Sequence, residues 1–148
     1  MRIQDLLKRS NLIKLSKTYE SKEFLFIDFI NHFFDRYDES KKARFVLTLL
    51  NREKMGSTYI GKQMALAHMI SSEIEKSQIY ICFLKEPFLE WDDEENFVKI
   101  VIVYCLRNNV DEFETIKKFS KRLAYETIKN EISSVEYDNL YDYFINKN

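Results

Sequence analysis

Two long apolar runs set the strongest limit on the fold of this 148-residue chain. The first covers residues 78–84 (QIYICFL) and the second covers residues 97–106 (FVKIVIVYCL). A half-exposed strand alternates polar and apolar residues, whereas nearly continuous β-branched and aromatic runs are typical of strands buried on both faces. The sequence therefore predicts two interior strands of a sheet that is covered on both sides.

Helical periodicity before these runs predicts the first covering layer. One helix is expected to begin at a Ser21 N-cap, and a second is expected to follow residues 38–40 and to end at Gly56. Short extended pieces are expected at 57–60 and 64–67. The expected apolar faces are Phe24, Ile27, Ile30, Phe34 and Tyr37 for the first helix, and Ala43, Val46, Leu47 and Leu50 for the second.

Two more helices are expected after the second run, each from a capping-box pattern: Asp111-x-x-Glu114 and Ser133-x-x-Glu136. The segment between the runs, with Pro87 and residues 91–95, is expected to hold an edge strand and a turn. The predicted fold is α/β: a mixed central sheet flanked by helices on both faces. The expected helix faces are Phe113, Ile116, Phe119 and Leu123, then Tyr137, Leu140, Tyr141 and Phe144.

Composition narrows the classes of function. Residues 1–148 are expected to form one domain, with 23 basic and 24 acidic residues and no basic stripe for nucleic acid. The longest apolar run is too short to span a membrane, and no signal core opens the chain. Cys82 and Cys105 lie in apolar runs and are expected to be buried reduced thiols. We expect a soluble, cytoplasmic protein without a metal or cofactor.

The only two glycines, Gly56 and Gly61, mark the candidate site. A chain so poor in glycine keeps it where the backbone needs a positive φ or a close approach to another group. The segment around them begins near Arg52 at a helix end and reaches His68 at the end of an extended piece.

Phosphoryl transfer is one chemistry that these residues suit. A neutral imidazole such as His68 is a nucleophile near pH 7, and a guanidinium such as Arg52 grips phosphate oxygens. Thr58 and the backbone N–H groups near Gly56 are further candidate donors. A lone histidine at a strand end is, however, more often a structural or surface residue, so the residues alone leave both interpretations open.

A resemblance makes the assignment more specific. The pattern Arg-Glu…Ser-Thr-x-Ile-Gly-x-x-x-Ala-x-x-His, which runs here from Arg52 to His68, resembles the signature of the fructose/mannitol-type enzyme IIA domain of the bacterial phosphotransferase system. The likeness extends from about Asn11 to Phe144. It implies a mixed sheet flanked by helices. It also implies that His68 accepts a phosphoryl group from the carrier HPr and passes it to a IIB domain, with Arg52 stabilising the phosphate.

Several positions depart from the family pattern. Family members usually have Gly-Asn-Gly where this chain has Gly61-Lys62-Gln63, and proline where it has Ala67. Glu112 stands where the family often has a second histidine. A carboxylate within about 4–6 Å of a phosphohistidine would repel it and would favour a protonated imidazole.

These departures favour a regulatory domain over a transport component. Similar domains occur in BglG-type antiterminators and mannitol-operon activators, where histidine phosphorylation reports sugar supply; other domains of such a regulator would then be partners. The alternatives are a transport-pathway IIA component that passes phosphate to a IIB domain, and a protein-binding domain that is never phosphorylated. Whether the domain acts as a phosphotransferase enzyme stays open.

Other candidate residues have simpler interpretations. His32 is expected to be a packing or surface residue, because no partner stands at metal-ligand spacing. Residues 92–95 are expected to form a solvated turn rather than a cation site. Tyr137, Tyr141 and Tyr143 are expected to be half-buried helix residues. Lys62 is either a surface residue or a further charge for a phosphate.

Overall fold

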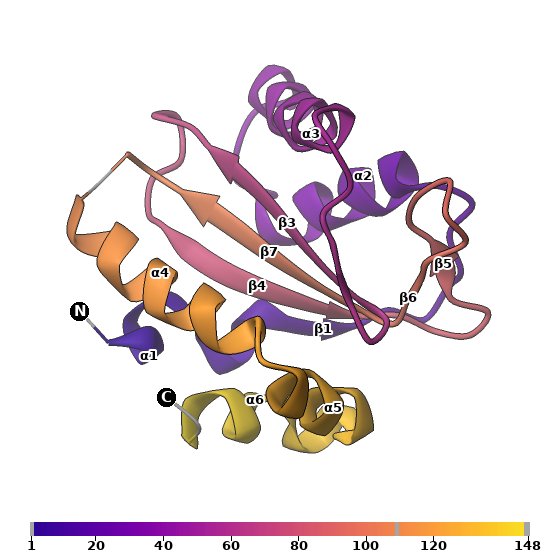
Figure 1. Cartoon of the computed structure of the whole chain (residues 1–148). Helices are drawn as coiled ribbons and strands as arrows, with labels where there is room; N and C mark the ends of the chain where they lie inside the picture. The colour runs from indigo at the N-terminus through magenta and orange to yellow at the C-terminus, as the bar shows by residue number, and fades with distance from the viewer. Residues whose placement is uncertain (1, 109, 147–148) are drawn as a thin grey trace.

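A five-stranded mixed sheet lies at the centre of the computed structural model, which describes residues 2–108 and 110–146 (Figure 1). The strand order is β1-β4-β7-β3-β2. β4 pairs antiparallel with β7, β2 pairs antiparallel with β3, and the β1–β4 and β3–β7 pairs are parallel. The strands are β1 (Leu12–Lys14), β2 (Tyr59–Gly61), β3 (Met64–Ile70), β4 (Gln78–Phe83) and β7 (Ile100–Leu106).

Helices cover both faces of this sheet (Figure 1). α2 (Lys22–Phe33) and α3 (Glu39–Lys54) lie on one face; α1 (Ile3–Leu6), α4 (Val110–Leu123), α5 (Glu126–Ser134) and α6 (Tyr137–Asn146) lie on the other, and a 3-10 turn (Arg9–Asn11) precedes β1. Successive residues of β7 enter opposite cores: Val101 and Val103 pack toward α2 and α3, whereas Ile102 packs toward α4. The α/β fold predicted from the two apolar runs is confirmed.

The second apolar run does not form a single strand, which corrects the prediction for residues 97–106. Phe97–Val98 forms β6, which pairs with β5 (Leu89–Glu90) in a separate two-stranded sheet. The N–H groups of Lys99 and Ile100 both donate to the Gln63 carbonyl, at 2.8 and 3.2 Å. This shared bond fixes the start of β7 beside β3 and leaves residues 97–98 to pair with β5, the expected edge strand.

The first two helices begin where the sequence predicts, and the faces that they bury agree with the expected ones only in part. The Ser21 hydroxyl accepts from the Phe24 N–H, and Asp38 caps α3 in the same way. α3 turns Phe45 and Leu49 to the sheet and leaves Ala43 and Leu47 exposed. The expected face is therefore only half correct: Val46 and Leu50 pack against the core, but Phe45 and Leu49 are the fully buried residues, and the Phe45 ring packs against Phe34 and Tyr37. α2 buries Leu25, Phe26, Phe29 and Ile30, and it ends at Phe33. Of its expected face, Ile30 is buried, as are Phe34 and Tyr37 just beyond the helix, whereas Phe24 is exposed.

The C-terminal part holds three helices instead of the expected two. Asp111 lies inside the first turn of α4, so it is not the N-cap of that helix. Ser133 lies in the last turn of α5, where its hydroxyl donates to the Asn130 carbonyl. α5 is short and buries few residues, which left too little periodicity to predict it. The expected faces of α4 and α6 are largely correct: Ile116, Phe119, Leu123, Leu140 and Phe144 are buried.

Cys82 and Cys105 are free thiols, fully buried in the core beneath α2 and α3, as expected. None of the helices in the described residues has the length and apolar character that crossing a bilayer needs.

Candidate functional site

Arg52 and His68 meet at the edge of the sheet. Arg52 lies in the last turn of α3, and its Nε donates to His68 Nε2 at 3.2 Å. β2 pairs only with the start of β3, so within the described residues no strand lies beside His68 on that edge. His68 is therefore only half-buried, although its strand belongs to the central sheet.

Several groups set the protonation state of His68. Burial lowers its pKa from the ordinary value of 6.5, and the Arg52 guanidinium lowers it further. A hydrogen bond to the Leu66 backbone and the charge of Glu53 act in the opposite direction, but the pKa remains lowered. Because Nε2 accepts from Arg52, the ring is neutral and carries its proton on Nδ1. The imidazole is thus in the form that can act as a nucleophile.

The Arg52 guanidinium has N–H donors that its contact with His68 does not use. Its Nη1 donates to the Gly56 carbonyl at 3.1 Å, which orients the fork toward the loop after α3. Nη2 has no hydrogen bond to any residue that the structure describes. An arriving anion can therefore bind the same guanidinium that contacts His68.

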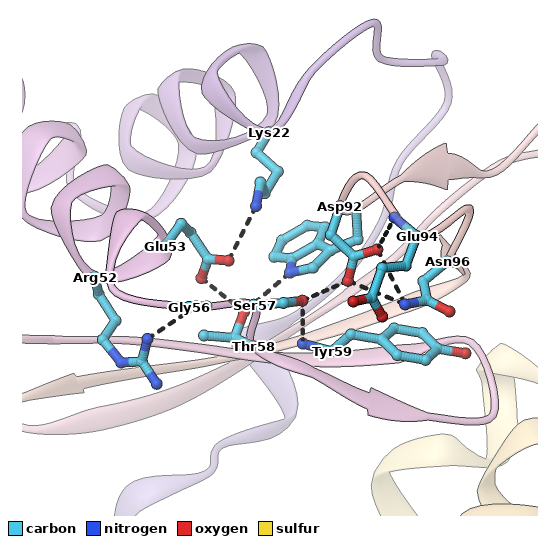
Figure 2. A network of polar contacts seen from close by, with 11 residues as sticks. Lys22, Arg52, Glu53, Gly56, Ser57, Thr58, Tyr59, Asp92, Glu94 and Asn96 are labelled. Atoms are coloured by element: carbon cyan, nitrogen blue, oxygen red, sulfur yellow. Dashed lines mark hydrogen bonds and ion pairs between the residues drawn. The ribbon is translucent and has the colours of Figure 1, made fainter.

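Glu53 lies at the centre of a buried polar network next to this pair (Figure 2). Its side chain is only 4% exposed. One carboxylate oxygen accepts from Lys22 Nζ at 3.1 Å, and the other accepts from the Thr58 hydroxyl at 2.6 Å. The Lys22–Glu53 ion pair links the start of α2 to the end of α3.

Thr58 joins this network to the β5–β6 hairpin. Its Oγ1 accepts from Trp91 Nε1 at 2.9 Å while its hydroxyl proton points to Glu53. Thr58 is buried, and its single O–H is already engaged. In this arrangement Thr58 fixes the loop and does not offer a donor to a ligand.

Ser57 forms a second link to the same hairpin (Figure 2). Its hydroxyl donates to Asp92 at 2.5 Å, and the amide of Asn96 holds the same carboxylate. Gly56, which precedes Ser57, has φ +141°, a conformation that side chains disfavour. The loop from Gly56 to Thr58 is thus held from both sides, at a fixed distance from Arg52.

The altered loop of the family pattern forms the tight turn between β2 and β3. Lys62 and Gln63 have φ values of 50° and 61°, the left-handed region in which two-residue hairpin turns favour asparagine and glycine. Gly61 has φ +101°, and a Cβ there would lie 3.2 Å from Lys129 Nζ. Lys129 is buried and donates to the Ile60 carbonyl at 2.7 Å, so it fastens the hairpin to α5.

Glu112 lies in the first turn of α4. Its buried carboxylate accepts from the Ser77 hydroxyl, and the same Ser77 oxygen accepts from the Arg107 N–H at 2.7 Å. The charges that act on the pKa of His68 are those of Arg52 and Glu53. Of the residues predicted for the site, the structure thus brings Arg52 and His68 together, with Thr58 close by through Glu53.

The remaining candidates lie in ordinary settings. His32 is exposed on α2 and packs edge-on against Phe33. Asp92 binds Ser57 and Asn96, and Lys62 is exposed. In the part of the chain that the structure describes, no group of three His, Cys, Asp or Glu side chains is arranged to hold a metal ion.

Sequence reasoning assigned no role to Glu53, Trp91 or Lys129. Glu53 carried a usable signal, because an acidic residue in the last turn of a helix opposes the helix dipole and so indicates a specific partner. Trp91 is the only tryptophan, but its link to Thr58 spans 33 residues and has no local pattern.

The sheet, its helices and the Arg52–His68 pair fit one class of protein, the IIA-type α/β domain. Residues 6–147 match the family described as "Phosphoenolpyruvate-dependent sugar phosphotransferase system, EIIA 2". The chain therefore belongs to this family.

Two relatives are much longer proteins. The transcriptional regulator ManR of Bacillus subtilis (strain 168) is 36% identical over 74 residues, which cover 50% of this chain and 11% of the regulator. The mannitol-specific EIICBA component of Klebsiella pneumoniae is 27% identical over 90 residues, which cover 59% of this chain and 14% of that protein. The chain thus aligns with only a small part of either relative.

Solved structures share the fold. The nitrogen regulatory protein IIA-Ntr of Neisseria meningitidis matches with a TM-score of 0.73 at 18% identity, over 96% of this chain and 98% of that one. IIA mannitol of Escherichia coli matches with a TM-score of 0.64 at 20% identity, over 90% and 95%. A complex of the Escherichia coli mannitol IIA enzyme with phosphorylated IIB matches with a TM-score of 0.67 at 21% identity, over 94% and 98%.

Proposed function

We propose that this chain is a phosphoacceptor domain in which His68 receives a phosphoryl group from HPr and Arg52 stabilises the group as it transfers. The observation that carries the proposal is the 3.2 Å contact between Arg52 Nε and His68 Nε2 at an open sheet edge. This contact supports the proposal, because a neutral imidazole and a guanidinium lie side by side and both are only half-buried. The proposal places the domain in the cytoplasm, where its two thiols stay reduced.

The transfer is a displacement between two imidazoles. The Nε2 lone pair of His68 forms the new N–P bond while the N–P bond of the donor phosphohistidine breaks, and its electron pair stays on the donor nitrogen. A proton passes from the His68 ring to the donor ring by way of solvent, which balances the charges. Little covalent work is left to the protein, because the transition state is loose and its negative charge lies on the phosphoryl oxygens.

Arg52 must change partner during this step. Its Nε–H occupies the Nε2 lone pair in the structure, so attack requires that hydrogen bond to open. The guanidinium then swings from the imidazole to the phosphoryl oxygens, and the Gly56 carbonyl and the rigid loop keep it within reach. The resting contact thus acts as a cap on the nucleophile that the arriving anion displaces.

The proposed use is regulatory, within a sugar-responsive transcription regulator or antiterminator. The 36% identity to part of ManR supports this use. So does the altered turn at Lys62 and Gln63. The second candidate is a transport component that hands its phosphoryl group to IIB; the likeness to a mannitol EIICBA component and to a IIA protein solved with phosphorylated IIB favours it.

Phosphorylation of the purified chain tests the proposal. The chain is incubated with phosphoenolpyruvate, enzyme I and HPr, and acid-labile label is followed. Label is expected in the wild type. It is also expected in His32→Ala, the matched control, which removes the other histidine at an exposed site. Label is expected to be absent from His68→Ala. Arg52→Met should slow labelling about a hundredfold, as loss of an oxyanion donor does.

The outcomes separate the candidates. Slow label that stays on the chain supports the regulatory use, and label that moves rapidly to a IIB domain supports transport. A wild-type chain that takes no label overturns the phosphoacceptor proposal and leaves a domain that only binds partners.

A further inference from the structure

An apolar groove with a volume of about 380 Å³ runs between α2 and α3. α2 contributes Ile27 and Ile30 to its lining, and α3 contributes Val46, Leu47 and Leu50. The floor of the groove belongs to the core beneath these helices, because Ile30 is buried in it and Val46 and Leu50 pack against it. Leu47, on the rim, is exposed.

The apolar residues of the groove form a continuous stripe. Ala43, Val46, Leu47 and Leu50 have the spacing i, i+3, i+4 and i+7, which is the full contact face of an amphipathic helix. Leu47 is 53% exposed, and Phe24, one turn before Ile27 on α2, is 55% exposed. Ile27, Val46 and Leu50 are half-buried, so part of this stripe also meets water. Apolar surface left in water is unfavourable and is typical of an interaction site.

Carboxylates stand at both ends of the groove. Glu23 lines it near Leu50, and Glu39 lines it eleven residues earlier on α3, about 16 Å away along the helix axis. Lys42 lies between them, but its ammonium already pairs with Glu39 and Asp35 at 3.4 and 3.7 Å. With two carboxylates on one ammonium, that end of the groove keeps a net negative charge.

We propose that this groove binds an amphipathic helix of a partner protein, about three turns long, with Lys or Arg at both ends of its apolar face. The apolar stripe supplies the contact, as in other helix-in-groove complexes. The separation of Glu23 and Glu39 sets the length, and their charge selects basic ends. This interaction is independent of phosphoryl transfer, because it uses none of the groups around His68.

Two synthetic helices of matched length test the proposal. Both carry leucines at i, i+3, i+4 and i+7; one has lysines at the ends of the leucine face and the other has glutamates there. Fluorescence anisotropy with the full chain is expected to show saturable one-to-one binding of the lysine helix and at least about tenfold weaker binding of the glutamate helix.

Matched variants locate the binding site. Leu47→Asp is expected to weaken binding of the lysine helix about tenfold or more, whereas Phe97→Asp, at an exposed position on β6, leaves it unchanged. The double variant Glu23→Gln/Glu39→Gln should reduce the preference for lysine, and Glu94→Gln/Glu95→Gln, in the exposed turn before β6, should not. His68→Ala should bind like the wild type. Circular dichroism verifies that each variant is folded.

Three results overturn the proposal. If Phe97→Asp weakens binding as much as Leu47→Asp does, the helix does not bind in the groove. If the lysine and glutamate helices bind equally well, the charge argument fails. Sedimentation that shows the chain alone forming a dimer, which Leu47→Asp dissociates, means that a second copy covers the groove. Loss of labelling at His68 with intact helix binding would instead contradict only the proposed function.

Discussion

The state of one imidazole depends on one guanidinium. Burial lowers the pKa of His68 most, and the charge of Arg52, whose Nε donates to Nε2, lowers it further. Arg52→Met, which keeps a long side chain without charge, should therefore raise the pKa of His68. NMR titration of the imidazole resonances measures this, with His32 as the internal reference. A His68 pKa that stays the same or falls in the variant would show that burial alone sets it.

The same lowered pKa makes stability depend on pH. Unfolded chains protonate His68 near its ordinary pKa of 6.5, but the folded chain does so only at lower pH. As the pH falls below about 6.5, the unfolded state binds a proton that the folded state does not, so the free energy of unfolding falls until the folded pKa is passed. Urea denaturation at several pH values should show this loss in the wild type and less of it in His68→Asn. An equal slope in both chains would contradict the assignment.

Removing the Thr58 hydroxyl should break the polar network at a single atom and lower the free energy of unfolding. Thr58→Val keeps the shape of the side chain, but it removes the donor to Glu53 and the acceptor of Trp91 Nε1. A buried polar group left without a partner costs about 1–3 kcal/mol, so the free energy of unfolding should fall by that amount. Urea denaturation followed by Trp91 fluorescence measures it. Thr58→Ser, which keeps the hydroxyl, should lose less; equal losses would mean that the methyl group matters instead.

The turn of the β2–β3 hairpin is strained by its residues. Gln63 has φ 61°, while its backbone N–H and carbonyl bond to Tyr59 and to Lys99 and Ile100. Gln63→Gly keeps these bonds and removes the steric cost of the left-handed conformation, which should raise the free energy of unfolding by about 1 kcal/mol. Thermal and urea denaturation test it. Ala43→Gly, inside α3, should lower stability by about 1 kcal/mol. A loss in both variants would show that Gln63 is not strained.

Sequence periodicity predicted which elements exist better than which faces they bury. β4 and β7 were found because burial on both sides leaves continuous apolar runs. The expected face of α3 was only half correct because its outer stripe, with Leu47, is as regular as its inner one, and the aromatic packing of Phe45 decides which residues are fully buried. In the candidate site, Arg52 and His68 followed from a pattern along the chain. Glu53, Lys22 and Trp91 come together only in the folded chain, so no local spacing could reveal their network.

The whole chain should unfold as a single unit, because both cores depend on the same strands. Neighbouring residues of β7 enter opposite cores, so losing either layer of helices would expose the sheet to water. Trp91 reports the core under α2 and α3, whereas the far-UV circular dichroism signal includes α4, α5 and α6 on the other face. The two urea transitions should coincide, as they do in a two-state domain.

Cys82 and Cys105 offer a third probe of the same unfolding. Burial raises the pKa of Cys82 to about 12, so a thiol reagent should label either residue only as the whole chain opens. A circular dichroism transition at lower urea than the Trp91 transition, with the thiols still protected, would show that the C-terminal helices form a separate unit.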